Sequence, residues 1–543
     1  MGAWQDDAIY VATATSLAEG HGYRHPEIPG EPFQAKYPVL YPALLSVLIR
    51  IAPEYPSNVP LLLAPTAIAA AALVVLSALY WRRCFAPDPL RWRLACILSA
   101  LSPAIVSMVR FTMSDLVYAA LALAALFQLD AADEIGEEEP SVRRGLMAGA
   151  LLGAATLTRS IGLSVLAGAV AFLFWRRRWR DASAVAGIAA LFIVPWHLWQ
   201  LQAAAANGAA LGDGSLAGLL LSELNYGIWA PVGAFETLRV VVQNAVRIVF
   251  GLPYFQFGLP SWIAADALGS FSWATIIVHV LGYSFLITLF AGFVVTVRQR
   301  LRALHLAAIA YAIVVLAYPG DPYRFLLPWA PFLIYFLLAG AGRAAHLAAG
   351  GSSLRSTRNE RIAMGVLGSL LALLFVTEDL RTVSGGASDY HFRVTPQDWG
   401  DARDLEAKLR ELTDPEDVVA SGDFAALYLS TGRQGYYAWP IENPYELFYG
   451  PDRSYWNFFI LGTETAADQV AERVRRMLPD AYRAAGVRWY VDNARPDVLT
   501  TAVRRLIAQR PQWFQPVYLT PQGMFRIYRV TLPPLPGPAG RST

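Results

Sequence analysis

The sequence predicts an α-helical protein that crosses a membrane many times and carries a C-terminal extracytoplasmic α/β domain. Of its 543 residues, 55% are hydrophobic and only 16% are charged, which is too apolar for an ordinary soluble domain. Apolar stretches of membrane-spanning length recur up to about residue 377. After residue 378 the pattern changes to short apolar strands alternating with charged helices, which indicates a separate small domain.

Ten apolar windows are long enough, or nearly so, to cross about 30 Å of hydrocarbon. They lie at 59–81, 92–109, 113–129, 145–158, 160–175, 183–201, 274–297, 304–319, 325–342 and 362–377. Arginine-rich short loops orient these windows, because such loops stay on the cytoplasmic side. The loops are at 82–93, near 143, and at 176–180, 298–302 and 343–361. An even number of windows separates each loop from the next, so one topology satisfies them all.

The same placement of arginine-rich loops on the cytoplasmic side decides the topology of two ambiguous stretches. The run 145–175 is long enough for a single helix, but arginines flank both ends. Two short helices that turn back at 158–160 are therefore predicted, and this turn places Arg159 on the outer side. The run 38–53 is predicted to be a helix in the outer interface, because a crossing there would reverse the loops that follow.

Four regions follow from this assignment. They are a first extracytoplasmic loop at 1–58, a transmembrane core at 59–377 with an outer loop at 202–273, a soluble α/β domain at 395–532, and a tail of disordered composition at 533–543. Predicted strands of the soluble domain are DVVASGD, ALYLSTG, VRWYVDN, PVYL and FRIYRV. Its predicted helices lie near 464–477 and 496–509.

Asp6 and Asp7 begin the segment QDDAIYVATATSLAEGHG, whose spacing predicts a short helix that stops at Gly20 and Gly22. One interpretation is that an aspartate caps this helix and complements its dipole. Successive helical residues point about 100° apart, so one carboxylate can cap while the other faces a cavity. A carboxylate kept ionised in such a cavity is a candidate general base.

Further charged residues gather near the predicted outer membrane boundary: Lys36, Arg110, Asp115, Arg159, Asp321 and Arg324. Lys36 is one of only two lysines among 44 lysines and arginines, and a compact ammonium suits a phosphate oxygen. The alternative for Lys36 is an interfacial lysine whose stem lies along apolar surface. Ionisable groups at membrane depth are costly unless paired or functional. The cluster is therefore either a set of ion pairs, such as Asp321 with Arg324, or a site for a lipid with an anionic head.

Five segments in order resemble a known superfamily. They are DDAIYVATATSLAEGHGY, AKYPVLYPALLS, FTMSDLVYAALALAALF, GLMAGALLGAATLTRSIGLSVLAGAVAFLFW and YRFLLPWAPFLIYFLLAG. Over residues 4–345 this order resembles the GT-C membrane glycosyltransferases, and within them the branch of protein O-mannosyltransferases, lipid A aminoarabinose transferases and bacterial lipopolysaccharide-core transferases. The resemblance implies the GT-C fold and a bacterial inner membrane location. It also implies transfer of a sugar, with inversion, from a polyprenyl phosphate to an extracytoplasmic hydroxyl of a lipid, glycan or protein.

The resemblance also implies roles for residues. The family's acidic pair falls on Asp6 and Asp7, with Asp6 as the general base and Asp7 as a supporting carboxylate. Lys36, Arg324 and, more distantly, Arg159 match donor-phosphate contacts. Supporting candidates are Asp115, Arg110, Tyr37 and Tyr41. Some relatives use Mg²⁺ or Mn²⁺ and others do not, and nothing in this sequence defines ligands for such an ion.

Members of the superfamily place a transmembrane helix before the acidic pair, whereas five residues precede Asp6 here. We therefore expect about ten transmembrane helices in the printed sequence, and eleven with a helix that precedes it. Two other functions compete with the transferase: a transporter or flippase of a lipid-linked substrate, and a non-catalytic membrane receptor with a glycan-binding domain. The net charge of +2 gives no indication of nucleic acid.

Overall fold

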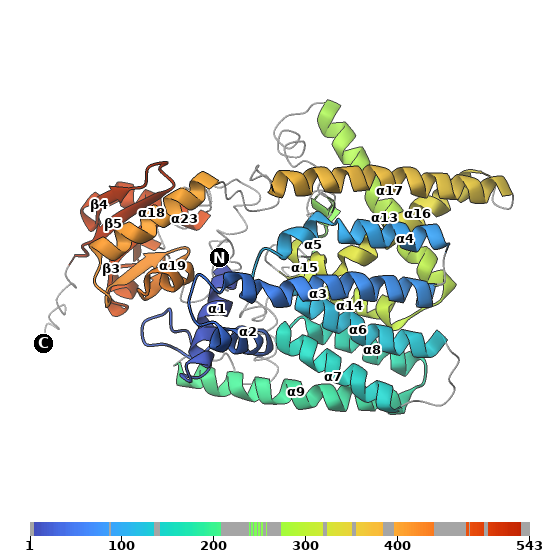
Figure 1. The fold of residues 1–543 in the computed structure, drawn as a ribbon, viewed down its shortest axis with the longest axis horizontal. Coiled ribbons are helices and arrows are strands. Elements are labelled where there is room, and N and C mark those ends of the chain that lie inside the picture. The colour runs from blue at the N-terminus through green and yellow to red at the C-terminus, as the bar shows by residue number, and fades with distance from the viewer. Residues whose placement is uncertain are drawn as a thin grey trace, which may run out of the picture.

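The structure is a computed structural model of the whole chain. It describes residues 5–85, 88–134, 142–207, 273–318, 323–349, 354–383, 396–438, 478–493 and 498–533, with separate short pieces between 238 and 257 and at 474–476. Most of the predicted outer loop, residue 321 and the end of the predicted tail lie outside the described residues. Figure 1 shows a bundle of long helices with a small domain beside one end of it.

Long helices lie side by side in the bundle (Figure 1). They are α3 (Val59–Tyr80), α4 (Pro89–Ala100), α6 (Asp115–Glu134), α7 (Val142–Thr158), α8 (Gly162–Trp175), α9 (Trp179–Ala206), α13 (Trp273–Gln299), α14 (Ala303–Ala317), α16 (Ala330–Ala348) and α17 (Leu354–Val383). Shorter pieces are the π-helical η1 (Trp81–Phe85), α5 (Pro103–Met108), α15 (Tyr323–Leu326) and the 3₁₀ turn η2 (Leu327–Trp329).

Each of the ten predicted windows falls on helix, and the predicted turn at 158–160 is confirmed between α7 and α8. Window 92–109 is divided into α4 and α5 before Pro103, because proline disfavours helix at the residue that precedes it. By length and composition, six helical segments of the described chain can cross a membrane: Val59–Phe85, Pro89–Met108, Trp179–Ala203, Gly282–Gln299, Arg324–Ala348 and Arg358–Arg381. Leu40–Ile51, Gly162–Trp175 and Ala303–Ala317 are shorter apolar helices.

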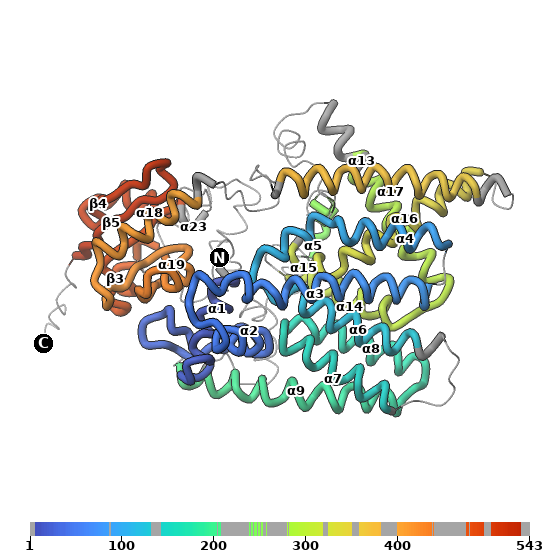
Figure 2. The backbone as a smooth tube through the Cα atoms, in the orientation of Figure 1, coloured from blue at the N-terminus to red at the C-terminus, as the bar shows by residue number. Residues whose placement is uncertain are grey.

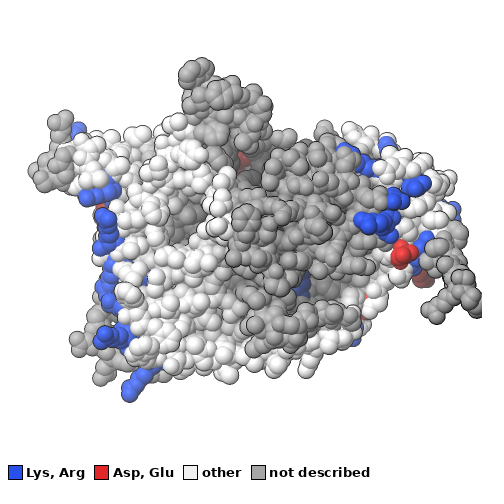
Figure 3. Space-filling view, turned by 180° about the vertical axis from the view of Figure 1, so that it is seen from behind, with Lys and Arg blue, Asp and Glu red and all other residues white. Residues whose placement is uncertain are grey.

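Basic side chains gather at the end of the bundle that lies away from the small domain (Figure 3). In the segments that join α3 to α4, α8 to α9, α13 to α14 and α16 to α17, or beside them, the exposed arginines include Arg82, Arg83, Arg176, Arg177, Arg298 and Arg343. Arginine gathered at one end of a membrane bundle is the pattern of a cytoplasmic face.

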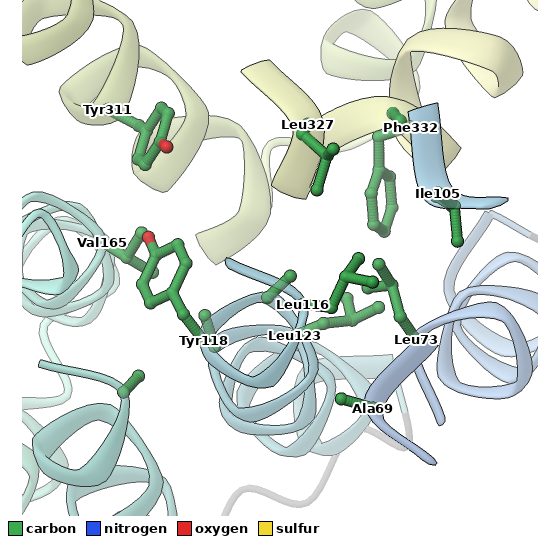
Figure 4. Packing of buried hydrophobic residues seen from close by; sticks show 14 of the residues in the cluster. Ala69, Leu73, Ile105, Leu116, Tyr118, Leu123, Val165, Tyr311, Leu327 and Phe332 are labelled. Carbon is green, nitrogen blue, oxygen red and sulfur yellow. The ribbon is translucent and has the colours of Figure 1, made fainter. Parts of the chain in front are cut away.

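The bundle core is closely packed around α6. Leu116 and Leu123 of α6 point toward Leu73 of α3 and Phe332 of α16 (Figure 4), and all four side chains are buried. At other helix crossings, small residues allow the two helix backbones to approach closely. A Cβ added at Gly168 of α8 would lie 2.4 Å from the Cα of Ala307 in α14, which is the backbone proximity typical of membrane helices.

The first 58 residues contain α1 (Gln5–Ala18) and α2 (Leu40–Ile51). Consecutive α1 residues from Asp7 to Ala14 are buried, as expected of a helix enclosed on all sides. The helix ends at Ala18, and the nearby Gly20 and Gly22 have φ of +84° and +89°, a conformation that suits glycine. The helix predicted at 38–53 is α2, which buries Tyr41 and exposes Val47. Its placement in the membrane interface stays a prediction.

The C-terminal domain has a five-stranded sheet in the order β2-β1-β3-β5-β4. Its strands are β1 (Val418–Ser421), β2 (Gly435–Tyr437), β3 (Val487–Asn493), β4 (Phe514–Leu519) and β5 (Phe525–Val530). Strand β1 is parallel to β2 and β3, while β5 is antiparallel to β3 and β4. The helices are α18 (Pro396–Leu412), α19 (Phe424–Thr431) and α23 (Val498–Gln509), with a 3₁₀ turn η3 (Pro511–Trp513) before β4. Of the predicted helix 464–477, only 474–476 lie among the described residues, and they are helical.

One strand prediction is wrong. ALYLSTG forms most of α19, which ends at Gly432 with a left-handed φ of +76°. Phe424, Leu427 and Thr431 are buried at helical spacing, and Phe424 belongs to the same hydrophobic cluster as the bundle core. Packing against the membrane half of the molecule therefore selected a helix where the short apolar run was ambiguous.

The small domain contacts the first helix of the chain. Helix α19 packs on α1, and the tube in Figure 2 shows α1 lying between the bundle and this domain. The backbone N–H of Gly435 donates to the carbonyl of Glu27 at 2.7 Å, and Gln434 Nε2 donates to the carbonyl of Pro26 at 3.2 Å. The domain is thus joined to the loop that follows α1.

Candidate active site

A cavity that is partly open to solvent lies where α1 meets the helix ends opposite the arginine-rich end. Its described lining residues are Asp6, Tyr10, Lys36, Tyr37, Pro38, Thr158, Arg159, Ser160, Ile161, Val314, Tyr318 and Phe325. The lining therefore combines three charged side chains, Asp6, Lys36 and Arg159, with apolar and aromatic ones. Such a cavity suits a ligand with an anionic head and an apolar tail.

Asp6 is the carboxylate among the described lining residues. Its Oδ2 accepts from Arg324 Nη1 at 2.7 Å, and its Oδ1 accepts a hydrogen bond from the Tyr37 hydroxyl. Burial alone would raise the pKa of Asp6. The charges of Arg324 and Lys36, with the two hydrogen bonds, outweigh burial and hold the pKa well below its usual range. Asp6 is therefore ionised at neutral pH.

Asp7 points elsewhere. Its side chain is fully buried, it is not among the described residues that line the cavity, and its carbonyl accepts from Thr112 Oγ1 at 3.1 Å. The roughly 100° between successive helical residues separates the two carboxylates, as the sequence predicted. Asp6 faces the cavity, and the capping interpretation does not describe its contacts.

Lys36 and Tyr37 enter the cavity from the loop after α1. Lys36 Nζ lies 4.8 Å from the centre of the Tyr37 ring. Burial lowers the pKa of Lys36, and the neighbouring Asp6 charge partly offsets this effect. Tyr10, four residues after Asp6 and on the same helix face, packs on Tyr37 with ring centres 4.9 Å apart. Burial raises the pKa of Tyr10 to about 12, so its phenol stays neutral.

Gln34 sets the conformation of this loop. Its fully buried side-chain oxygen accepts from the backbone N–H groups of Lys36 at 2.8 Å and Tyr37 at 3.2 Å. Helix α9 holds the same segment from outside, because Trp199 Nε1 donates to the Gln34 carbonyl and Gln200 Nε2 to the Ala35 carbonyl. The conformation of Lys36 and Tyr37 thus depends on Gln34 and on the end of α9.

We expect Gln34→Leu to lower kcat/KM by about tenfold or more, because burial of two unpaired N–H groups costs on the order of 1–3 kcal/mol each. Gln34→Glu should retain most activity, since a carboxylate oxygen accepts from the same two groups. Gln34 Nε2 has no hydrogen-bond partner among the described residues, so this exchange removes no contact there. Steady-state kinetics with thermal unfolding of both variants checks the prediction, and equal losses in the two would contradict it.

Arg159 and Arg324 are brought together by Asp115. Asp115, at the start of α6, is 1% exposed, and its Oδ2 lies 2.6 Å from Arg159 Nη1 and 3.0 Å from Arg324 Nη2. Arg159 lines the cavity, whereas Arg324 is not among its described lining residues. The predicted alternative of ion pairing inside the cluster is therefore realised, although two of its members still face the cavity.

Arg110 and Tyr41 are not among the described residues that line the cavity. Arg110 is exposed in the turn after α5. Tyr41 is fully buried and bonds to Thr66 Oγ1 at 3.1 Å. Asp321 lies outside the described residues. Sequence reasoning missed Gln34 and Tyr10, and only Tyr10 had a local signal, its spacing of four from Asp6.

Among the described residues, no group of three or more His, Cys, Asp or Glu side chains lies in an arrangement that could hold a metal ion. The carboxylates of Asp6 and Asp115 contact arginines in this structure.

No family model matches the sequence, and no curated protein matches it. Solved structures do match its fold. The archaeal oligosaccharyltransferase AglB from Archaeoglobus fulgidus, in complex with an inhibitory peptide and a dolichol-phosphate, matches with a TM-score of 0.52 at 15% identity, over 98% of this chain and 71% of that one. ArnT from Cupriavidus metallidurans matches with a TM-score of 0.50 at 11% identity, over 97% of this chain and 94% of that one. Both are GT-C glycosyltransferases. The chain has their fold.

Proposed function

We propose that the protein is an inverting glycosyltransferase that moves a sugar from a polyprenyl-phosphate donor to an acceptor hydroxyl on the extracytoplasmic face. One observation carries this proposal: Asp6, Lys36 and Arg159 line a single cavity together with apolar side chains such as Ile161, Val314 and Phe325. A base and two cations beside apolar side chains suit a lipid-linked phosphosugar. The fold of two glycosyltransferases supports the proposal, and one of them was solved with a dolichol-phosphate.

The proposed step balances with the residues at hand. The acceptor oxygen forms a bond to the anomeric carbon while its proton passes to Asp6. The bond between that carbon and the phosphate oxygen breaks, and its electron pair leaves with the phosphate. Attack from the side opposite the phosphate inverts the anomeric centre. Lys36 and Arg159 stabilise the charge that grows on the leaving polyprenyl phosphate.

The orientation follows from charge. The arginine-rich end is proposed to be cytoplasmic, which places the cavity and the C-terminal domain outside. The same proposal includes a bacterial inner membrane location and an acceptor that is a lipid, glycan or protein. It also assigns the protein to the branch of protein O-mannosyltransferases, lipid A aminoarabinose transferases and bacterial lipopolysaccharide-core transferases.

A transfer assay with a panel of polyprenyl-phosphate sugars and a mixture of envelope acceptors tests the function. We expect Lys36→Gln to raise the KM for the donor by about 10–100-fold, because a hydrogen bond between charged groups contributes about 1.5–3 kcal/mol. Lys408→Gln, a lysine of the soluble domain that pairs with Glu411, is the matched control. No transfer with any donor, or equal KM values for the two variants, would contradict the proposal.

A further inference from the structure

Four side chains from distant parts of the chain form a row of alternating charge. Arg159 contacts Asp115 at 2.6 Å, Asp115 contacts Arg324 at 3.0 Å, and Arg324 contacts Asp6 at 2.7 Å. Between charges with little water, such contacts interact far more strongly than on an exposed surface. The row therefore responds as a unit when the charge at one end changes.

Only the two ends of this row face the cavity. Arg159 and Asp6 are lining residues, whereas Asp115 and Arg324 are not among them. The middle pair lies behind the wall. We therefore expect a head group in the cavity to contact Arg159 and Lys36 rather than Arg324.

Asp6 accepts hydrogen bonds at both of its oxygens in this state. Tyr37 donates to Oδ1 and Arg324 donates to Oδ2. A carboxylate held by two donors, one of them charged, is a weak proton acceptor. Proton transfer from an acceptor hydroxyl is favoured only when one of these donors is loosened.

We propose that Arg324 and Asp115 are positioning residues that couple the head-group subsite at Lys36 and Arg159 to the base Asp6, so that the bound phosphate increases the basicity of Asp6. This inference rests on the proposed function. It assigns Arg324 to the carboxylates rather than to the phosphate that the resemblance implied.

The coupling runs along the row. A phosphate beside Arg159 weakens the hold of that arginine on Asp115. Asp115 then attracts Arg324 more strongly, and the bond from Arg324 to Asp6 weakens. The phosphate gains a second negative charge as its bond to the sugar breaks, so the effect grows when the acceptor proton must move.

Other charged and titratable groups that face Asp6 are Lys36 and Tyr37 from the loop after α1 and Tyr10 from α1 itself. The cations hold the pKa of Asp6 low before donor binds. Removal of Arg324 must therefore raise that pKa and move the acid limb of the kcat/KM profile to higher pH, because activity is lost as Asp6 becomes protonated.

The test compares Arg324→Gln with Arg159→Gln, and uses Arg403→Gln, an exposed arginine of α18, as the control. Three quantities are measured: the Kd for a polyprenyl phosphate, kcat, and the pH profile of kcat/KM. For Arg324→Gln we expect a Kd within about threefold of the parent and an acid limb raised by about one pH unit. We also expect a kcat lower by about 100-fold, because Asp6 loses the contact that orients it toward the acceptor hydroxyl. For Arg159→Gln we expect a Kd raised by about tenfold or more.

A Kd raised as much by Arg324→Gln as by Arg159→Gln, or an acid limb that does not move, would overturn the proposal. Arg324→Lys serves if the glutamine variant does not fold. The lysine keeps a positive charge but cannot bridge both carboxylates. We therefore expect a smaller upward shift of the acid limb of the kcat/KM profile for Arg324→Lys than for Arg324→Gln. If the acid limb does not shift in Arg324→Lys, the proposed coupling is again overturned. If the parent transfers no sugar from any donor, the proposed function fails, while the Kd comparison still decides which arginine binds phosphate.

Discussion

Replacement of Asp6 by Asn should reduce sugar transfer by about 10²–10⁴-fold, the usual contribution of a general base. The amide has the same shape and can still accept from Tyr37 or Arg324, the two donors that hold Asp6, but it cannot take the acceptor proton. The Kd for a polyprenyl phosphate should stay within about threefold, because Lys36 and Arg159 remain in place. Single-turnover transfer and equilibrium binding measure the two quantities separately.

Asp480→Asn is the matched control, since Asp480 is 75% exposed in the soluble domain. Asp7→Asn is the informative comparison. Asp7 is fully buried and is not among the described residues of the cavity wall. A loss of transfer in Asp7→Asn that exceeds the loss in Asp6→Asn would reverse the assignment of the base. Full transfer in Asp6→Asn would leave a transporter or receptor as the better interpretation.

Replacement of Asp115 by Asn should have the largest effect on stability. The carboxylate is 1% exposed and contacts both Arg159 and Arg324. Removal of one partner from a buried ion pair costs about 3–5 kcal/mol, because the remaining charge is left without compensation. Thermal unfolding in detergent measures the change against the parent.

The double variant Asp115→Asn with Arg159→Gln checks the cause. If uncompensated charge is responsible, the second substitution should recover part of the loss, and the two effects will not add. A loss below about 1 kcal/mol in Asp115→Asn would mean that the arginines do not depend on this carboxylate, as is usual for exposed pairs.

Much of the fold could be predicted from local features of the sequence. Hydrophobic length placed all ten windows on helices, and the arginines at both ends of 145–175 required the turn that brings Arg159 to the cavity wall. Strands β1, β3, β4 and β5 were also predicted from short apolar runs. Each of these features depends on residues near one another in the chain.

The wrong predictions and the missed residue depend instead on contacts that the local sequence does not reveal. ALYLSTG is a helix that packs on α1 and on elements of its own domain, and a strand prediction from local pattern could not detect these contacts. Arg324 was expected at a phosphate, and its bonds to Asp6 and Asp115 span 318 and 209 residues. No sequence pattern indicated the role of Gln34, since this role depends on how the loop after α1 folds back on itself.

The sequence by itself determined a polytopic helical protein, its soluble domain, and the identity of the charged residues near one face. These properties follow from hydrophobic length and charge, which act over a few turns of chain. Only the tertiary structure decided that Asp6 rather than Asp7 faces the cavity, and that Asp115 joins two arginines behind its wall. Contacts of that kind form between helices far apart in sequence, and packing of the whole bundle selects them.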